Sequence, residues 1–132
     1  MSSFRQTQTE INDAKCLEDA LKQMGYKPSV SSEKQAVRGH YNESRKAEIV
    51  LKKEDLKEGG DVGFSKDSKG NFSIVTDTYV MRNGFNLEKF TKDVKQKYAE
   101  VKIRKQASAA GLTFLKKIDT QNGGFKLQFV KA

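Results

Sequence analysis

The feature that most constrains this fold is a long stripe of apolar residues at helical spacing in the second half of the chain. Its members follow one another at intervals of three, four, four and three residues: Leu87, Phe90, Val94, Tyr98 and Val101. Residues at these intervals lie on one face of an α-helix, so the stripe predicts a helix that must bury this face. Asn86 is a suitable N-cap, and Gly111 is suited to end the helix.

A second stripe predicts a shorter helix near the N-terminus. Its apolar residues are again spaced for one helical face: Leu17, Ala20, Leu21 and Met24. Asn12 and Asp13 are N-cap residue types. Gly25 follows the stripe and tolerates the left-handed conformation that often ends a helix.

Much of the remaining chain alternates between apolar and polar residues, which is the pattern of half-buried strands. We expect strands in seven segments: residues 4–11, 35–39, 47–51, 61–65, 72–77, 112–115 and 125–129. The polar cluster 66–71 and the Asn122-Gly123 pair predict two hairpin turns. Residues 53–60 are interpreted as a polar loop.

Strands that follow one another without helices between them pair in the antiparallel sense. We therefore expect one α+β domain over residues 1–132, with the order β-α-β-β-β-β-α-β-β and two helices packed on one face of a mainly antiparallel sheet. The predicted core joins the helical stripes to five strand residues: Phe72, Ile74, Phe125, Leu127 and Phe129. The other face of the sheet is expected to be more exposed, and free to bind a partner or a second subunit.

Composition excludes several classes of protein. Cys16 is the single cysteine, so an intrachain disulfide and a cysteine-based zinc site are both excluded. A buried Cys16 is favoured over a reactive one. The sequence has no apolar run of about 20 residues and no secretory signal pattern. We expect an intracellular, cytoplasmic protein without a membrane span.

Four residues form a candidate polar site: Arg38, His40, Asp61 and Asp77. The lone histidine is a potential general base, and the two carboxylates are potential ligands of a hard cation. The alternatives are a strand end or turn at His40, a turn capped by Asp61, and an exposed Asp77. The glycine-rich stretch 59–63 precedes a strand instead of a helix, so it is not a phosphate cradle. We expect no catalytic residue, metal or cofactor.

The net charge is +8, from 25 basic and 17 acidic residues. Twenty of the basic residues are lysine, which is common on ordinary surfaces, so the charge is weak support for nucleic-acid binding. A candidate basic surface lies on the second helix: Lys89, Lys92, Lys95, Lys102 and Lys105. A solvated helix face is the favoured interpretation, and a phosphate-contacting helix is the alternative.

Short segments spread from end to end carry a resemblance to a known family: residues 1–4, 8–11, 17–26, 38–41, 47–52, 61–64, 72–77 and 96–99, then Gly111 and the hairpin with Gly123. Their order and spacing resemble a family of unknown function that includes a conserved hypothetical reading frame of red-algal chloroplasts and cyanobacteria. The resemblance implies no established activity, cofactor or catalytic residue. The family commonly has tryptophans that this chain lacks, and often has Tyr-His where Glu100 and Val101 stand here.

These observations leave three functions open. A non-enzymatic accessory or adaptor module, which binds an unidentified protein partner or forms a homo-oligomer, is favoured because no catalytic constellation is visible. A nucleic-acid-binding protein is the alternative, motivated by the basic charge. An enzyme with a small, unusual site requires that Arg38, His40, Asp61 and Asp77 line one pocket.

Overall fold

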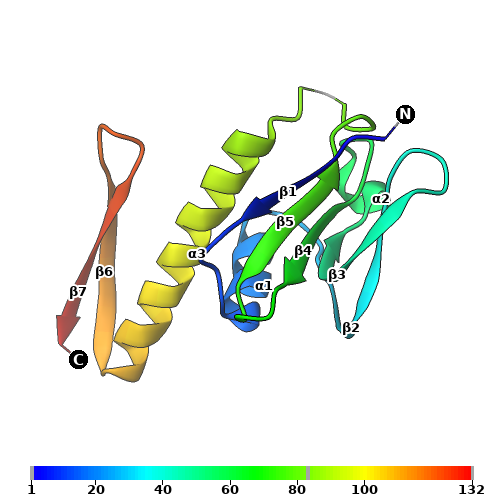
Figure 1. Cartoon of the computed structure of the whole chain (residues 1–132). Helices are drawn as coiled ribbons and strands as arrows, with labels where there is room; N and C mark the ends of the chain where they lie inside the picture. Colours follow the sequence, from blue (N-terminus) through cyan, green and yellow to red (C-terminus); the bar gives the residue numbers. More distant parts are fainter. Residues whose placement is uncertain (1, 83, 132) are drawn as a thin grey trace.

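The computed structural model describes residues 2–82 and 84–131 (Figure 1). Its elements, in chain order, are β1 (Phe4–Gln8), α1 (Ala14–Gln23), β2 (Ser29–Arg38), β3 (Ser44–Leu51), α2 (Lys53–Leu56), β4 (Val62–Lys66), β5 (Phe72–Asp77), α3 (Leu87–Ala109), β6 (Leu112–Asp119) and β7 (Phe125–Lys131). The α+β class and the predicted order of strands and long helices are confirmed. One short helix, α2, is an addition to the predicted order.

Local sequence signals set the ends of the two long helices. The Asp13 side chain accepts a hydrogen bond from the Cys16 N–H at 3.0 Å and so caps α1. Asn86 caps α3 in the same way by accepting from the Lys89 N–H at 3.0 Å. Gly25, just past α1, has a φ of +91°, a conformation that glycine adopts without a steric penalty. These caps are the ones that the sequence predicts.

Five strands form one antiparallel sheet in the order β1-β5-β4-β3-β2, and both long helices pack on the same face of it (Figure 1). The main core joins α1 and α3 to the inner strands of the sheet. Its largest fully buried side chains include Leu17, Leu21, Ile49, Phe64, Phe72 and Ile74. The two predicted helical stripes therefore pack against the sheet as expected.

The opposite face of the sheet is covered as well, so the expectation that it is more exposed is wrong for β4 and β5. The β2–β3 register shifts between Val30 and Gln35. A bulge of this kind increases strand twist, and the end of β2 approaches β4 and β5. Val37 is fully buried there in a second cluster with Ala47 and Val50. Every residue of β5 is consequently buried.

The C-terminal hairpin is the largest departure from the prediction. Strands β6 and β7 form a separate two-stranded sheet on the far side of α3 from the main sheet (Figure 1). The sequence predicts that Phe125, Leu127 and Phe129 join the main core, but they are half-buried in this hairpin and lie outside that core. The chain reverses at Gly111, where φ is +79°, and so folds back along the outer side of α3. We call residues 112–131 the C-terminal arm.

The predicted polar loop 53–60 contains α2, a single helical turn. Leu56 is its one buried side chain and packs into the main core. One apolar residue among polar neighbours gives no periodic signal, so the turn is set by this tertiary contact and not by pattern.

Candidate functional site

The carboxylate of Asp61, one of the four predicted polar-site residues, is fully buried at the start of β4 and saturated with hydrogen bonds. Its Oδ2 accepts from the Arg38 backbone N–H at 2.7 Å and from Arg38 Nε at 2.8 Å. Its Oδ1 accepts from Arg38 Nη2 and from the Lys53 N–H, both at 2.8 Å. Asp61 therefore fastens the end of β2 and the start of α2 to the sheet.

Asp77, at the end of the adjacent β5, has a similar role. It is fully buried, not exposed as the alternative interpretation has it. Its Oδ1 accepts from the N–H groups of Ser3 at 2.7 Å and Tyr79 at 3.0 Å, and its Oδ2 accepts from the His40 N–H at 2.9 Å. Burial follows because the bent end of β2 covers this carboxylate.

The electrostatics keep both carboxylates ionised. Burial raises the pKa of Asp61, but hydrogen bonds from Arg38 and from backbone N–H groups outweigh it, and the net pKa is lowered. Burial likewise raises the pKa of Asp77, and the three backbone donors bring it below its ordinary value. Hydrogen bonding to Asp61, and then to Glu54, raises the pKa of Arg38, while Arg38 lowers the pKa of Glu54 to about 2.

The structure thus brings the four residues together in two pairs: Arg38 with Asp61, and the His40 backbone with Asp77. The His40 ring itself stacks edge-on against Tyr41 at 4.2 Å and Tyr79 at 4.8 Å between ring centroids. Carboxylates whose lone pairs accept internal donors have little capacity left for a substrate or cation. In residues 2–82 and 84–131, no group of three or more His, Cys, Asp and Glu side chains is placed to hold a metal ion. The geometry is that of a structural clamp.

The five predicted basic residues on α3 have different surroundings. Lys89 pairs with Asp93 of the same helix at 2.7 Å, and Lys105 lies 3.8 Å from Asp19 of α1. Lys102 donates to Asn12 Oδ1 at 3.2 Å. The two others are exposed: Lys92 lies near Gly123 at the tip of the arm, and Lys95 lines a surface groove.

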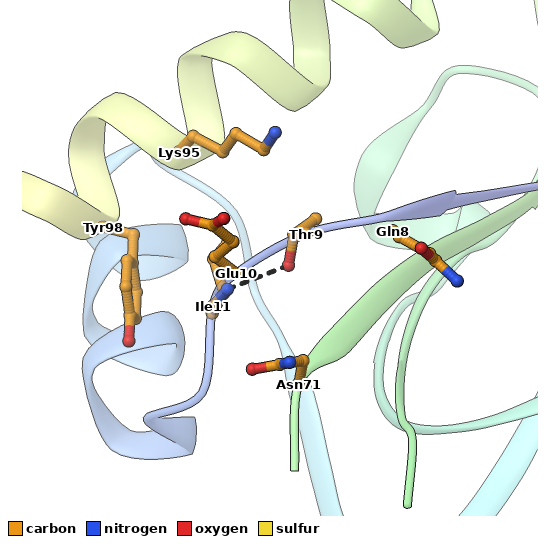
Figure 2. A pocket seen from close by; sticks show the side chains of 7 residues that line it. All are labelled: Gln8, Thr9, Glu10, Ile11, Asn71, Lys95 and Tyr98. Atoms are coloured by element: carbon orange, nitrogen blue, oxygen red, sulfur yellow. Dashed lines mark hydrogen bonds between the residues drawn. The ribbon is translucent and has the colours of Figure 1, made fainter. Parts of the chain in front are cut away.

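That groove has a volume of about 640 Å³ and lies between α3 and the segment that leaves β1 (Figure 2). Its lining is mainly polar: Gln8, Thr9, Glu10, Ile11, Asn71, Lys95 and Tyr98. Thr9 is tied into the fold, because its hydroxyl donates to the Phe72 carbonyl at 2.5 Å and accepts from the Ile11 N–H at 3.1 Å. The groove presents one acid and one amine, and none of the four residues of the predicted polar site.

Charge is distributed very unevenly along the chain. Residues 1–86 contain 14 basic and 13 acidic residues, whereas residues 87–132 contain 11 basic and four acidic residues. Almost the whole net charge of +8 therefore belongs to α3 and the C-terminal arm. The folded protein has a nearly neutral five-stranded part and a strongly basic helix and arm.

Glu100 of α3 holds the arm in place. It is only 4% exposed. Its Oε1 accepts from Lys117 of β6 at 2.8 Å and from Lys97 at 3.3 Å, and Arg104 Nε lies 3.3 Å from its Oε2. The Arg104 guanidinium also covers the Phe114 ring at 3.7 Å from its centroid. Burial raises the pKa of Glu100, but Lys117 and Lys97 lower it further, so the net pKa lies below its usual value.

The face of the arm turned away from α3 combines apolar and basic side chains. Cross-strand pairs place three pairs of residues on it: Ile118 with Lys126, Lys116 with Gln128, and Thr113 with Val130. Ile118 is 37% exposed and Val130 is 45% exposed. Leu115, at the register shift between Phe114 and Lys116, is 57% exposed. These seven residues, with Leu115 included, are the outer face of the arm.

Sequence reasoning missed both Glu100 and the outer face. The signal for the outer face lies in the first strand of the hairpin, where Leu115 and Ile118 break the alternation that Phe114 begins. The imbalance of charge after residue 86 is also visible in the sequence. Glu100 has no such signal, because a glutamate on a lysine-rich helix looks like a solvated residue until the position of Lys117 is known.

A further expectation concerns the environment of Cys16. Cys16 is 1% exposed, and burial raises the pKa of its thiol, which confirms a buried cysteine over a reactive one. In the described parts of the chain, no helix has both the length and the apolar character needed to cross a membrane.

Comparison with known proteins agrees with the predicted resemblance. The profile of DUF1257, a family described as "Protein of unknown function", matches residues 20–128. A relative from Pyropia yezoensis, described as "Uncharacterized protein ycf35", is 27% identical over 127 residues, which cover 96% of this chain and 94% of the relative. No solved structure matches the chain. The chain belongs to the DUF1257 family of proteins of unknown function.

Proposed function

We propose that this protein is a non-enzymatic interaction module, a single domain that binds a protein partner through its C-terminal arm. The observation that carries this proposal is the outer face of the arm, where Leu115, Ile118 and Val130 are all exposed at intervals along a hairpin outside the main core. Exposed apolar residues are ordinary when scattered, but a group on one face is typical of an interaction surface.

The contacts that stabilise the arm support this proposal. A two-stranded hairpin is only marginally stable on its own and needs a packing partner. The chain supplies one in α3, through the buried Glu100 and the stacking of Arg104 on Phe114. These contacts hold the arm on the side of α3 away from the five-stranded sheet, which is consistent with a preformed binding surface.

The saturated carboxylates also favour a module over an enzyme. Asp61 and Asp77 use their oxygens to hold the end of β2 and the residues just after it in place, which supports a role in stabilising the fold. As part of this proposal the protein acts in the cytoplasm, where a reducing environment suits the lone thiol of Cys16.

The proposal is tested by cross-linking in the full-length protein. A photo-reactive amino acid replaces Lys116 on the outer face, and in a matched control it replaces Lys27, an exposed lysine remote from the arm in sequence. We expect a defined protein adduct from position 116, its loss when Ile118→Asp is added, and no such adduct from position 27. Repeated absence of an adduct at 116 in native extract, with a monomer on size exclusion, contradicts the proposal.

Nucleic-acid binding is the second candidate, and the concentration of basic residues in α3 and the arm favours it. Two observations weigh against it. Several of these cations are already paired within the chain, and Phe114 lies beneath Arg104 and is not free to stack a base. Fluorescence anisotropy with a mixed DNA and RNA pool tests it. Tight binding that weakens steeply with salt supports this candidate, and no binding at low salt removes it.

A further inference from the structure

The outer face of the arm carries positive charge without internal compensation. Lys116 and Lys126 project from it, and neither forms a salt bridge with a described residue. The inner face differs, because Lys117 is neutralised there by Glu100 at 2.8 Å. The outer face has no acidic side chain, since its members are Thr113, Leu115, Lys116, Ile118, Lys126, Gln128 and Val130. A complementary ligand therefore combines apolar groups with carboxylates.

The dimensions of the face fit one helix. β6 contains eight residues, and at about 3.3 Å per residue a strand of that length spans about 26 Å. Each strand occupies about 4.8 Å of the width of a sheet, so two strands form a platform about 10 Å wide, which is about the diameter of one α-helix. The inner face of the same hairpin already accommodates one helix, α3.

From these observations we infer that the outer face binds an acidic amphipathic helix of the partner protein, an inference that rests on the proposed function. Apolar residues of that helix pack on Leu115, Ile118 and Val130, and its flanking carboxylates pair with Lys116 and Lys126. The helix needs about 17 residues to span the face at 1.5 Å per residue. A second copy of this chain that docks arm to arm is a poor occupant, because it would bring its own basic α3 and arm against these lysines.

The test uses a synthetic peptide as the probe, with the full-length protein. The peptide has about 17 residues, with Leu at helical spacing and Glu elsewhere, and a scrambled peptide of the same composition is its control. Binding is measured by fluorescence anisotropy at low and high salt. We expect the patterned peptide to bind, the scrambled one to bind much more weakly, and added salt to weaken both.

Matched charge variants locate the binding surface. Lys116→Glu with Lys126→Glu is expected to weaken peptide binding on the order of tenfold or more, while Lys116→Arg with Lys126→Arg retains it. Lys27→Glu with Lys69→Glu changes the net charge equally and is expected to change affinity by less than about twofold. Circular dichroism of each variant checks that the fold is intact.

Several outcomes overturn the inference. The inference fails if the patterned peptide does not bind, or if the scrambled peptide binds equally well. It also fails if the control variant of Lys27 and Lys69 loses as much affinity as the variant of Lys116 and Lys126. Tighter binding of anionic vesicles or double-stranded RNA with the same dependence on Lys116 and Lys126 assigns the face to a membrane or to nucleic acid instead. A Lys116 cross-link that persists while the peptide fails leaves the interaction module intact and removes only the acidic helix.

Discussion

Arg38 and Asp61 are joined by three hydrogen bonds that bind the end of β2 to the start of β4. The Arg38 backbone N–H and Nε lie 2.7 and 2.8 Å from Oδ2, and its Nη2 lies 2.8 Å from Oδ1. The carboxylate is fully buried, whereas the Arg38 side chain remains 43% exposed and also reaches Glu54 at 2.6 Å. Asp61 is therefore enclosed within the fold, whereas Arg38 links it to the exposed Glu54.

Replacement of Asp61 by Asn is expected to lower the free energy of unfolding by about 2–4 kcal/mol, because it leaves buried donors without their charged acceptor. Urea titration followed by circular dichroism measures the change. Glu54→Gln is the matched control, since it removes the other, exposed carboxylate that holds Arg38. We expect a much smaller effect from the control, and equal effects would show that Asp61 is not the centre of this cluster.

The lowered pKa values of Asp61 and Asp77 predict a loss of stability in acid. A carboxyl group whose pKa is lower in the folded than in the unfolded state stabilises the fold fully above the unfolded pKa. This contribution disappears as the pH falls through the folded pKa. We expect nearly constant stability above about pH 5 and a decline below about pH 4. Thermal unfolding across this range should show a shallower decline in Asp61→Asn, and identical profiles would contradict the assignment.

Gly39 permits the close approach of β2 to the rest of the sheet. A Cβ atom at this position would lie 2.5 Å from the Phe4 ring and 2.6 Å from Asp77 Oδ2. Gly39→Ala is therefore expected to destabilise the protein by about 1–3 kcal/mol through overpacking. Ser32→Thr also adds one methyl group, at an exposed position of β2, and should change stability little. A neutral Gly39→Ala would mean that the end of β2 is not held against Asp77.

Glu100→Gln is expected to loosen the arm selectively, because it removes the charge that Lys117 and Lys97 share. Hydrogen exchange should quicken in β6 and β7 by about tenfold or more, which corresponds to about 1.4 kcal/mol or more of local stability, while β4 and β5 change little. Glu88→Gln makes the same chemical change at an exposed site of α3 and serves as the control. Uniform quickening over the whole chain would show that the arm and the core unfold together.

The success of the sequence-based prediction depended on how local each signal is. The stripe through Phe90, Val94 and Tyr98 and the cap at Asn86 act within a few residues, and the structure confirms both. The structure also joins Arg38 to Asp61 and the His40 backbone to Asp77, but the two carboxylates already accept hydrogen bonds from within the protein. Whether a carboxylate is saturated depends on donors such as the Ser3 and Lys53 N–H groups, which are remote in sequence and belong to no motif.

The C-terminal hairpin shows where local signals fail. Phe125, Leu127 and Phe129 alternate with polar residues, which is the pattern of a strand packed against any apolar surface. Gly123 has the positive φ that the Asn-Gly turn predicts. The same pattern serves a hairpin in the main sheet and one on the outer side of α3. Only the path of α3 across the sheet decides between them.

By itself, the sequence determined the identity and order of the main elements, the two helix caps, the hairpin turns and membership of a family, because these depend on short-range spacing or on order along the chain. The tertiary structure decided three other matters. It buried Asp61 and Asp77 beneath the end of β2, placed Glu100 against Lys117, and left the outer face of the arm exposed. Each of these depends on long-range packing, since burial and charge pairing are set by neighbours that sequence separation does not reveal.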